Sequence, residues 1–178
     1  MPELWGRPVT TVIGLDLSLT STGLALVEDG ELTSWHCIKS KKNGDTIEAM
    51  SERIDGIVSE VASTAYDWMC IGAYEPHPFD LAVIEAPSFG SKGGSAHERG
   101  GLWWAVASIL REAEVPLLKL APTSRAKFIT GNGRADKHDV LKMARQRWHM
   151  DIPNHDVADA AGLARWGYDQ LTTTGDAA

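Results

Sequence analysis

Four acidic residues occupy positions where strand and helix geometry would gather their carboxylates. Asp16 ends one apolar segment rich in β-branched residues, and Glu85 ends another. Asp156 and Asp159 are three residues apart in a helical pattern, so their side chains share one face of that helix. A carboxylate at the end of a buried strand is costly unless it is paired, hydrogen-bonded or bound to a metal. These positions indicate a site that binds cations.

If the four carboxylates converge, their mutual repulsion requires a strong counter-charge. Two Mg²⁺ ions about 4 Å apart would supply it and form a phosphoryl-transfer site, one ion activating water and the other stabilising the leaving oxygen. Simpler explanations exist: Asp16 could cap a turn, Glu85 could pair with a lysine or arginine, and Asp156 could be the first-turn acid of its helix. Asp159 lies inside the apolar run VADAAGLA and is the hardest to explain in this way.

Hydrophobic periodicity divides the chain into strands and helices that would position these acids. The predicted strands are 10–17, 22–27, 32–38, 81–86 and 115–120, and the predicted helices are 45–65, 102–113, 122–130, 136–148 and 154–171. Asp45 is the expected N-cap of the first helix. Five glycines within 87–101 predict a mobile loop, and the tail from about residue 172 is expected to fray.

Three successive strands followed by helix-linked strands predict an α/β fold. Strands one to three would be antiparallel in a mixed five-stranded sheet flanked by helices, with the later strands added by crossovers. The chain has 178 residues, 43% of them apolar, which excludes a disordered chain and fits a single domain over 1–178. The predicted tail is the only part expected to lie outside that domain's core.

The composition also bears on the compartment. No apolar run reaches the roughly 18 residues that span a bilayer, and the first residues lack the pattern of a signal peptide. Cys37 and Cys70 have neither the spacing of a zinc site nor that of a CxxC pair, which favours buried thiols in a reducing compartment. We therefore expect a soluble protein of the cytoplasm, with no membrane partner.

Four segments, in order, resemble the motifs of the RuvC-type Holliday-junction resolvases. They are GLDLSLTSTGLALVEDG, LAVIEAPSFG, KFITGNGRADKHDVLKMA and HDVADAAGLA. The resemblance runs from about residue 12 to residue 164, and the combination is specific although no single motif is. It implies a ribonuclease H-like fold and a metal-dependent, structure-selective endodeoxyribonuclease. Such an enzyme resolves four-way DNA junctions by paired nicks as a homodimer, in a bacterial cytoplasm or that of a phage-infected host.

The same resemblance implies roles for individual residues. The catalytic, metal-binding carboxylates of the family fall on Asp16, Glu85, Asp156 and Asp159, and they imply two Mg²⁺ ions per site, with Mn²⁺ as a substitute. Lys137 matches a catalytic lysine near the scissile phosphate. His155 directly precedes Asp156, so the sequence leaves open whether it joins the metal site.

Charge is strongly segregated along the chain. The formal net charge is −7, yet residues 119–149 contain eight lysines and arginines against two acids, a local charge of +6. Such a segment suits DNA phosphates, although a solvated helical surface is the simpler alternative. The expected DNA contacts are Phe89, Lys92, Arg125, Lys127, Arg134, Lys137 and Lys142. Phe89 could enter the junction centre or instead anchor its loop on the core.

Trp103 and Trp104 open the helix that follows the glycine-rich loop. Adjacent helical residues point about 100° apart, so one tryptophan should pack inward while the other is free to meet a partner. The resemblance implies a homodimer through this helix. Ordinary core packing of both side chains is the alternative.

Two other functions fit part of the pattern. The segment GLDLSLTSTGLALV also resembles the first phosphate loop of actin-like and sugar-kinase ATP-binding proteins, but 178 residues cannot supply their second lobe. A catalytically idle junction-binding protein of the same fold is the third candidate. The complete set of four carboxylates argues against it.

Overall fold

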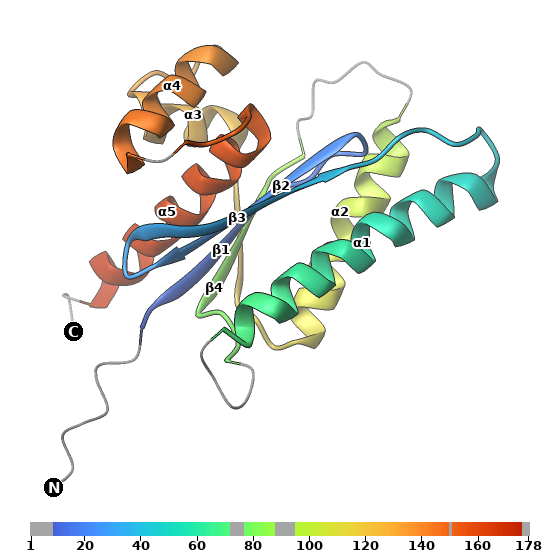
Figure 1. Ribbon diagram of the computed structural model, residues 1–178, viewed down its shortest axis with the longest axis horizontal. Coiled ribbons are helices and arrows are strands. Elements are labelled where there is room, and N and C mark those ends of the chain that lie inside the picture. Colours follow the sequence, from blue (N-terminus) through green and yellow to red (C-terminus); the bar gives the residue numbers. More distant parts are fainter. Residues whose placement is uncertain (1–8, 72–76, 88–94, 150, 176–178) are drawn as a thin grey trace, which may run out of the picture.

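A mixed five-stranded sheet forms the centre of the molecule, as the sequence predicted. The computed structural model describes residues 9–71, 77–87, 95–149 and 151–175 (Figure 1). β1 (Thr11–Asp16), β2 (Ser21–Glu28) and β3 (Glu31–Lys39) form an antiparallel meander. β4 (Leu81–Glu85) is parallel to β1, and β5 (Leu117–Leu120) is parallel to β4, giving the order β3-β2-β1-β4-β5. This confirms the predicted α/β fold.

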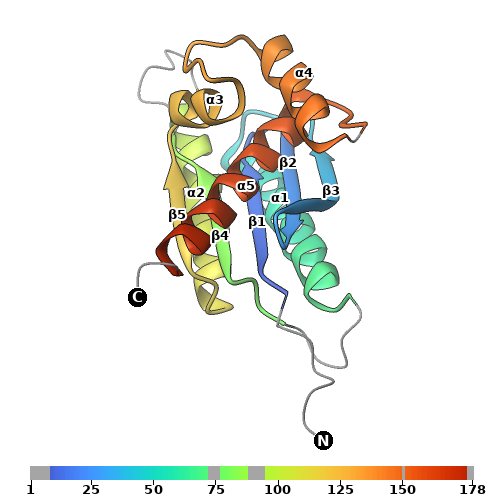
Figure 2. The same cartoon turned by 90° about the vertical axis from the view of Figure 1, so that its left-hand side faces the viewer.

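Helices cover both faces of the sheet (Figures 1 and 2). α1 (Ile47–Met69) and α2 (Ala96–Glu112) lie on one face. α5 (His155–Gly175) crosses the other face, and α3 (Pro122–Thr130) and α4 (Lys137–Trp148) pack against it at one end of the sheet (Figure 2). No helix in the described ranges combines the length and the apolarity needed to cross a membrane.

Three predicted boundaries were wrong. Thr46, and not Asp45, caps α1, because its hydroxyl accepts a hydrogen bond from the Ala49 amide at 3.2 Å. α2 begins at Ala96, so the expected loop at 87–101 is helical over its last six residues. α5 continues to Gly175, where the Thr172 hydroxyl donates to the Tyr168 carbonyl at 3.0 Å. Glycine and threonine disfavour helix only weakly, and tertiary packing overrides that preference.

Each strand divides its side chains between two cores. Val12 of β1 and Val83 of β4 pack with α5, while Ile13 and Ile84 pack with α1 and α2. Since strand side chains alternate between faces, the residues that end β1 and β4, Asp16 and Glu85, belong to the α5 face. The same alternation assigns Ser21 of β2 to that face. The strands therefore place their polar ends under α5.

The backbone of α5 lies directly against β1 and β2. A Cβ atom added at Gly14 would lie 2.1 Å from the Ala160 carbonyl oxygen, and one added at Gly23 would lie 2.1 Å from the Asp156 carbonyl oxygen. No side chain fits in such a gap. Glycine at both positions thus fixes the height and register of the helix that carries Asp156 and Asp159.

Candidate active site

The four predicted acids meet at one end of the sheet, under the first turns of α5. β1 and β4 are parallel neighbours with Leu15 opposite Ile84, so Asp16 and Glu85 leave the sheet at the same edge. Asp156 is in the first turn of α5 and Asp159 in the next. Asp159 is only 5% exposed, whereas the other three acids are half-buried. The structure therefore brings together residues that are up to 143 positions apart.

Arg125 of α3 joins two of these acids. Its Nη1 pairs with Glu85 Oε2, and its Nη2 lies 3.1 Å from Asp159 Oδ2. The Arg125 side chain is 10% exposed and its Nε has no hydrogen-bond partner in the described structure. The sequence assigned Arg125 to the DNA surface, but the structure places its guanidinium inside the acidic cluster.

The electrostatics of the cluster favour protonated acids. Burial, followed by the nearby charge of Asp159, raises the pKa of Asp16 to about 7, although Arg125 partly opposes the rise. Burial also raises the pKa of Asp159 to about 6 against the lowering effects of Arg125 and Lys137. Because burial is the main cause of both shifts, the ionised carboxylates lack the solvation that an additional cation would replace, and perturbed acids of this kind are typical of functional sites.

Two side chains that the sequence did not connect with the acids hold Asp156. The Ser21 hydroxyl donates to Asp156 Oδ2, and Lys39 Nζ lies 3.6 Å from the same oxygen. Lys39 also donates to the Ser21 hydroxyl. Ser21 stands two residues before Gly23 on the α5 face of β2, and that period-two spacing is the signal that could have indicated its role.

His155 points in a different direction from Asp156. Its Nδ1 donates to the Lys137 carbonyl oxygen at 2.8 Å, and its ring meets the ring of His138 edge to face with centroids 5.3 Å apart. Both contacts are with α4. In this arrangement His155 ties the start of α4 to the start of α5, while Asp156 faces the sheet.

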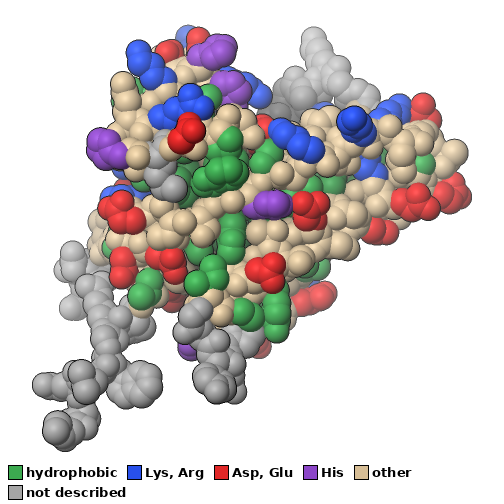
Figure 3. All heavy atoms as spheres, in the orientation of Figure 1, with side chains coloured by type: hydrophobic (Ala, Val, Ile, Leu, Met, Phe, Trp, Pro, Cys, Tyr) green, Lys and Arg blue, Asp and Glu red, His purple; other side chains and the backbone are tan. Residues whose placement is uncertain are grey.

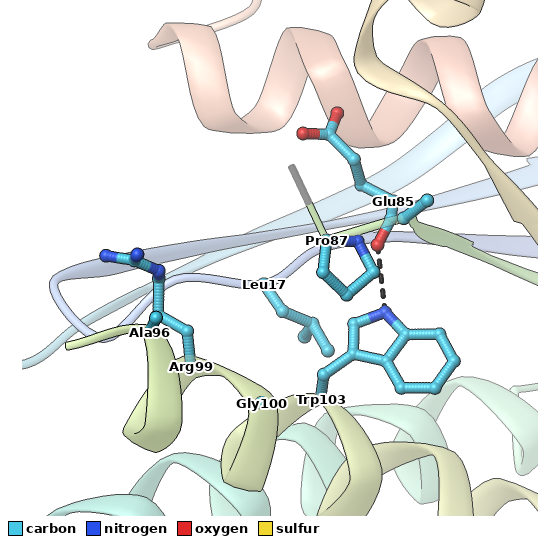
Figure 4. Close-up of a pocket in the computed structure, with 8 residues that line it drawn as sticks. Leu17, Glu85, Pro87, Ala96, Arg99, Gly100 and Trp103 are labelled. Atoms are coloured by element: carbon cyan, nitrogen blue, oxygen red, sulfur yellow. Dashed lines mark hydrogen bonds between the residues drawn. The ribbon is translucent and has the colours of Figure 1, made fainter. Parts of the chain in front are cut away.

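Trp103 connects α2 to the end of β4. Its indole Nε1 donates to the Glu85 backbone carbonyl at 2.9 Å, and the Glu85 carboxylate points away from the indole (Figure 4). Beside it lies a hollow of about 160 Å³, lined in part by Leu17, Pro87 and Arg99. Trp103 therefore fixes the backbone of one predicted ligand from the opposite face of the sheet. No feature of the sequence pointed to this bond.

The donor chemistry fits a divalent cation of the magnesium type, which prefers carboxylate oxygens. Within the described ranges, however, no three His, Cys, Asp or Glu side chains are already arranged around a common point. The reason is visible in the contacts, because Arg125 takes oxygens of Glu85 and Asp159 while Ser21 and Lys39 take an oxygen of Asp156. The carboxylates that a metal ion would need are present, but Arg125, Lys39 and the Ser21 hydroxyl already bind three of them.

The other predicted DNA contacts are distributed over α3, α4 and the segment between them. Lys127, Arg134, Lys137 and Lys142 are exposed. Phe89 and Lys92 lie outside the described residues. Figure 3 shows lysine, arginine and histidine side chains gathered over the α3–α4 end of the molecule. The basic segment found in the sequence therefore forms a surface next to the acidic cluster.

Comparisons with known proteins agree with this geometry. Residues 12–165 match the family model described as crossover junction endodeoxyribonuclease RuvC. A protein of that name from Rhodopirellula baltica is 29% identical over 163 residues, which cover 88% of this chain and 85% of the relative. One from a Wolbachia strain of Brugia malayi is 28% identical over 159 residues, covering 88% and 92% respectively.

Solved structures give the same fold. The structure of Thermus thermophilus RuvC superposes with a TM-score of 0.69 at 22% identity, covering 92% of this chain and 98% of that one. T. thermophilus RuvC in complex with a Holliday junction substrate gives a TM-score of 0.70 at 20% identity, covering 92% and 97%.

Proposed function

The chain belongs to the RuvC family of crossover junction endodeoxyribonucleases, and from this premise we propose that it resolves four-way DNA junctions by metal-dependent hydrolysis. The observation that carries the proposal is the meeting of four acidic side chains under α5, two of them with raised pKa values. A merely junction-binding protein has no use for such costly burial of like charges. The family match over 12–165 also argues against the ATP-binding alternative.

Asp16, Glu85, Asp156 and Asp159 are the proposed metal ligands. Two Mg²⁺ ions bound there, or Mn²⁺ in their place, would activate the attacking water and stabilise the leaving oxygen. The protein's own part is to hold the ligands in place: Gly14 and Gly23 set the height of α5, Ser21 and Lys39 orient Asp156, and Trp103 fixes the backbone at Glu85.

Lys137 is the proposed basic residue nearest the scissile phosphate. It is the first residue of α4 and is exposed, and its charge lowers the pKa of both Asp16 and Asp159. It therefore lies close enough to the cluster to act on a phosphate bound there. Within the described residues its ammonium forms no ion pair, which leaves it available to an incoming anion.

The DNA path would extend from the α3–α4 surface across the acidic cluster to a second basic region. That region is a hollow of about 480 Å³ between the β1–β2 turn, α1 and α2, lined by Ser18, Leu19, Thr20, Ser40, Lys41, Lys42, Arg53, Ser95 and Arg99. Arg53 stiffens it by donating to the Leu19 carbonyl and, at 3.1 Å, to the Ser40 hydroxyl. Lysine and arginine side chains follow the upper edge of Figure 3. Two basic regions on either side of a nuclease site suit two DNA arms.

A homodimer through α2 is supported by the two tryptophans. Trp104 is 68% exposed and meets Trp103 edge to face, with ring centroids 4.9 Å apart. A large exposed tryptophan is typical of the centre of a protein interface. Replacing Trp104 with serine should convert a dimer into a monomer, as measured by light scattering after gel filtration. A dimer of unchanged strength would place the interface elsewhere.

The direct test uses a synthetic four-way junction with labelled arms. With Mg²⁺ the protein should produce symmetric nicks in two opposite strands, and a linear duplex of the same sequence should remain uncut. An Asp16→Asn protein run in parallel controls for contaminating nuclease. Equal cleavage of junction and duplex would contradict junction selectivity, and cleavage in excess chelator would contradict metal dependence.

A further inference from the structure

Arg125 is the only buried lysine, arginine or histidine in the part of the chain that the structure describes. A buried basic side chain is costly unless acidic partners compensate it. Arg125 contacts Glu85 and Asp159, which come from two different elements. Both partners belong to the proposed metal-binding set. The buried arginine therefore neutralises the site itself and not a surface ion pair nearby.

The packing between α3 and α5 is arranged around this side chain. A Cβ atom added at Gly162 would lie 2.3 Å from Ile129 Cδ1 and 3.5 Å from Arg125 Cγ. Gly162 thus lets Ile129 of α3 pack closely on α5, with the stem of Arg125 beside it.

Arg125 and a divalent cation would compete for the same two carboxylates. Mg²⁺ and Mn²⁺ bind carboxylate oxygens directly, and the Arg125 nitrogens already bind Glu85 Oε2 and Asp159 Oδ2. A guanidinium held at those oxygens would also repel a dication placed beside it, since like charges a few ångströms apart in a buried site interact strongly. A metal ion bound to the other oxygens of these two carboxylates would still lie beside the guanidinium, so the two cations would weaken each other's binding.

We infer that Arg125 is an internal counter-ion, which divalent metal ions must displace from Glu85 and Asp159 before these carboxylates can bind them. The inference rests on the proposed nuclease function, because it concerns the metal site of that function. Arg125 stabilises the clustered acids and at the same time weakens their affinity for metal. Guanidinium groups bind phosphate as readily as carboxylate, so a displaced Arg125 has a ready partner in the DNA backbone.

Calorimetric titration of the DNA-free protein with Mn²⁺, and then with Mg²⁺, tests the inference without measuring activity. Arg125→Gln removes the charge, and the metal dissociation constant should become at least about 10-fold smaller than in the wild type. Arg125→Lys retains the charge, so its metal dissociation constant should lie closer to the wild type than that of Arg125→Gln, although an ammonium cannot bridge both carboxylates as the guanidinium does. The matched control is Arg165→Gln, which breaks an ion pair with Asp169 elsewhere on α5 and should leave metal affinity unchanged.

A purely structural role for Arg125 predicts a different result. Arg125→Gln would then melt at a lower temperature and bind metal no more tightly than the wild type, and that outcome overturns the inference. If the wild type and all variants bind no divalent ion, the metal-dependent function fails together with the inference. If the wild type binds metal and Arg125→Gln binds equally, only the inference fails.

A measurement on the wild type covers the case in which Arg125→Gln does not fold. The ¹⁵N-edited NMR signal of Arg125 Nε–H, assigned by its absence from Arg125→Lys, should exchange slowly with water because this atom is buried. Saturating Mg²⁺ should shift this signal and speed its exchange. A signal that keeps its position and its protection at saturating Mg²⁺ would show that Arg125 stays in place, and would overturn the inference.

Discussion

The two faces of the sheet are built in different ways. On the α5 face, backbone lies against backbone at Gly14 and Gly23, and α5 carries two of the four acids. On the opposite face, large side chains such as Leu15 and Leu102 separate the sheet from α1 and α2. The glycine of α1, Gly56, does not contact the sheet: it is exposed, and a Cβ added there would have no neighbour within 4 Å.

This difference shows where positional accuracy is needed. Bulky side chains can repack when a neighbour changes, whereas two backbones in direct contact cannot move apart without shifting every residue attached to them. The α5 face positions the carboxylates that we propose share bound cations. The α1–α2 face contributes one backbone contact to the site, from Trp103 to the Glu85 carbonyl, and otherwise forms the outline of the domain and the exposed Trp104.

The largest expected effect is the loss of junction cleavage when an acid on the α5 face is replaced. Asp16→Asn should lower the rate of junction cleavage by about 100-fold or more, because a neutral amide binds Mg²⁺ poorly. Junction binding in a gel-shift assay should be retained, since the change removes a charge that repels phosphate. Asp55→Asn, on the exposed side of α1, is the matched control and should cut normally. Wild-type cleavage by Asp16→Asn would refute the site assignment.

A pair of glycine replacements tests the close backbone contact of α5, with a solvent-exposed glycine of α1 as the control. Gly23→Ala forces a Cβ against the α5 backbone and should lower the free energy of unfolding by about 3 kcal/mol or more. Gly56→Ala introduces a better helix former into open space on α1 and should raise it by up to about 1 kcal/mol. Urea denaturation followed by circular dichroism measures both. Similar small effects at the two positions would remove the distinction between the faces.

The stability of the protein in chelator should fall as the pH rises from about 5 to about 8. In the folded chain the pKa of Asp16 is about 7 and that of Asp159 about 6, so the folded state holds protons that the unfolded state has already lost. Ionisation at higher pH therefore destabilises the folded state. Asp16→Asn should flatten the upper part of this profile, with Tm at pH 8 above the wild type by about 5 °C.

At pH 8 the addition of Mg²⁺ should restore the stability that the protein loses in chelator, because a bound cation stabilises the ionised carboxylates. A Tm that rises with pH in chelator would contradict the raised pKa values.

The smallest expected effect concerns a single phosphate contact. Lys137→Ala should reduce the slope of log K against log salt for junction binding by about 0.9, the value for one lost contact on duplex DNA. Lys41→Ala, in the second basic region beside α1, should reduce it by a similar amount if DNA extends over both faces. An unchanged slope for Lys41→Ala would confine the DNA to the α3–α4 side.

The sequence by itself determined the order of elements and the identity of the acids. The continuous apolar runs of β1 and β4 are the local pattern of strands that are buried on both faces, and the three-residue spacing of Asp156 and Asp159 places them on one face of a helix. These patterns were sufficient to predict the sheet, and together with the resemblance to the RuvC motifs they proposed which carboxylates meet. Boundaries such as the start of α2 at Ala96 were missed, since local preference at glycine is weak compared with packing.

Tertiary structure alone decided how the acids are neutralised. Arg125 is 40 residues from Glu85 in sequence, and the charge of the 119–149 segment gave no reason to separate it from its exposed neighbours. The contacts of Ser21 with Asp156 and of Trp103 with the Glu85 carbonyl likewise join distant elements. Composition and periodicity report which face a residue occupies, but the pairing of charges depends on distances between elements, which exist only once the helices have packed on the sheet.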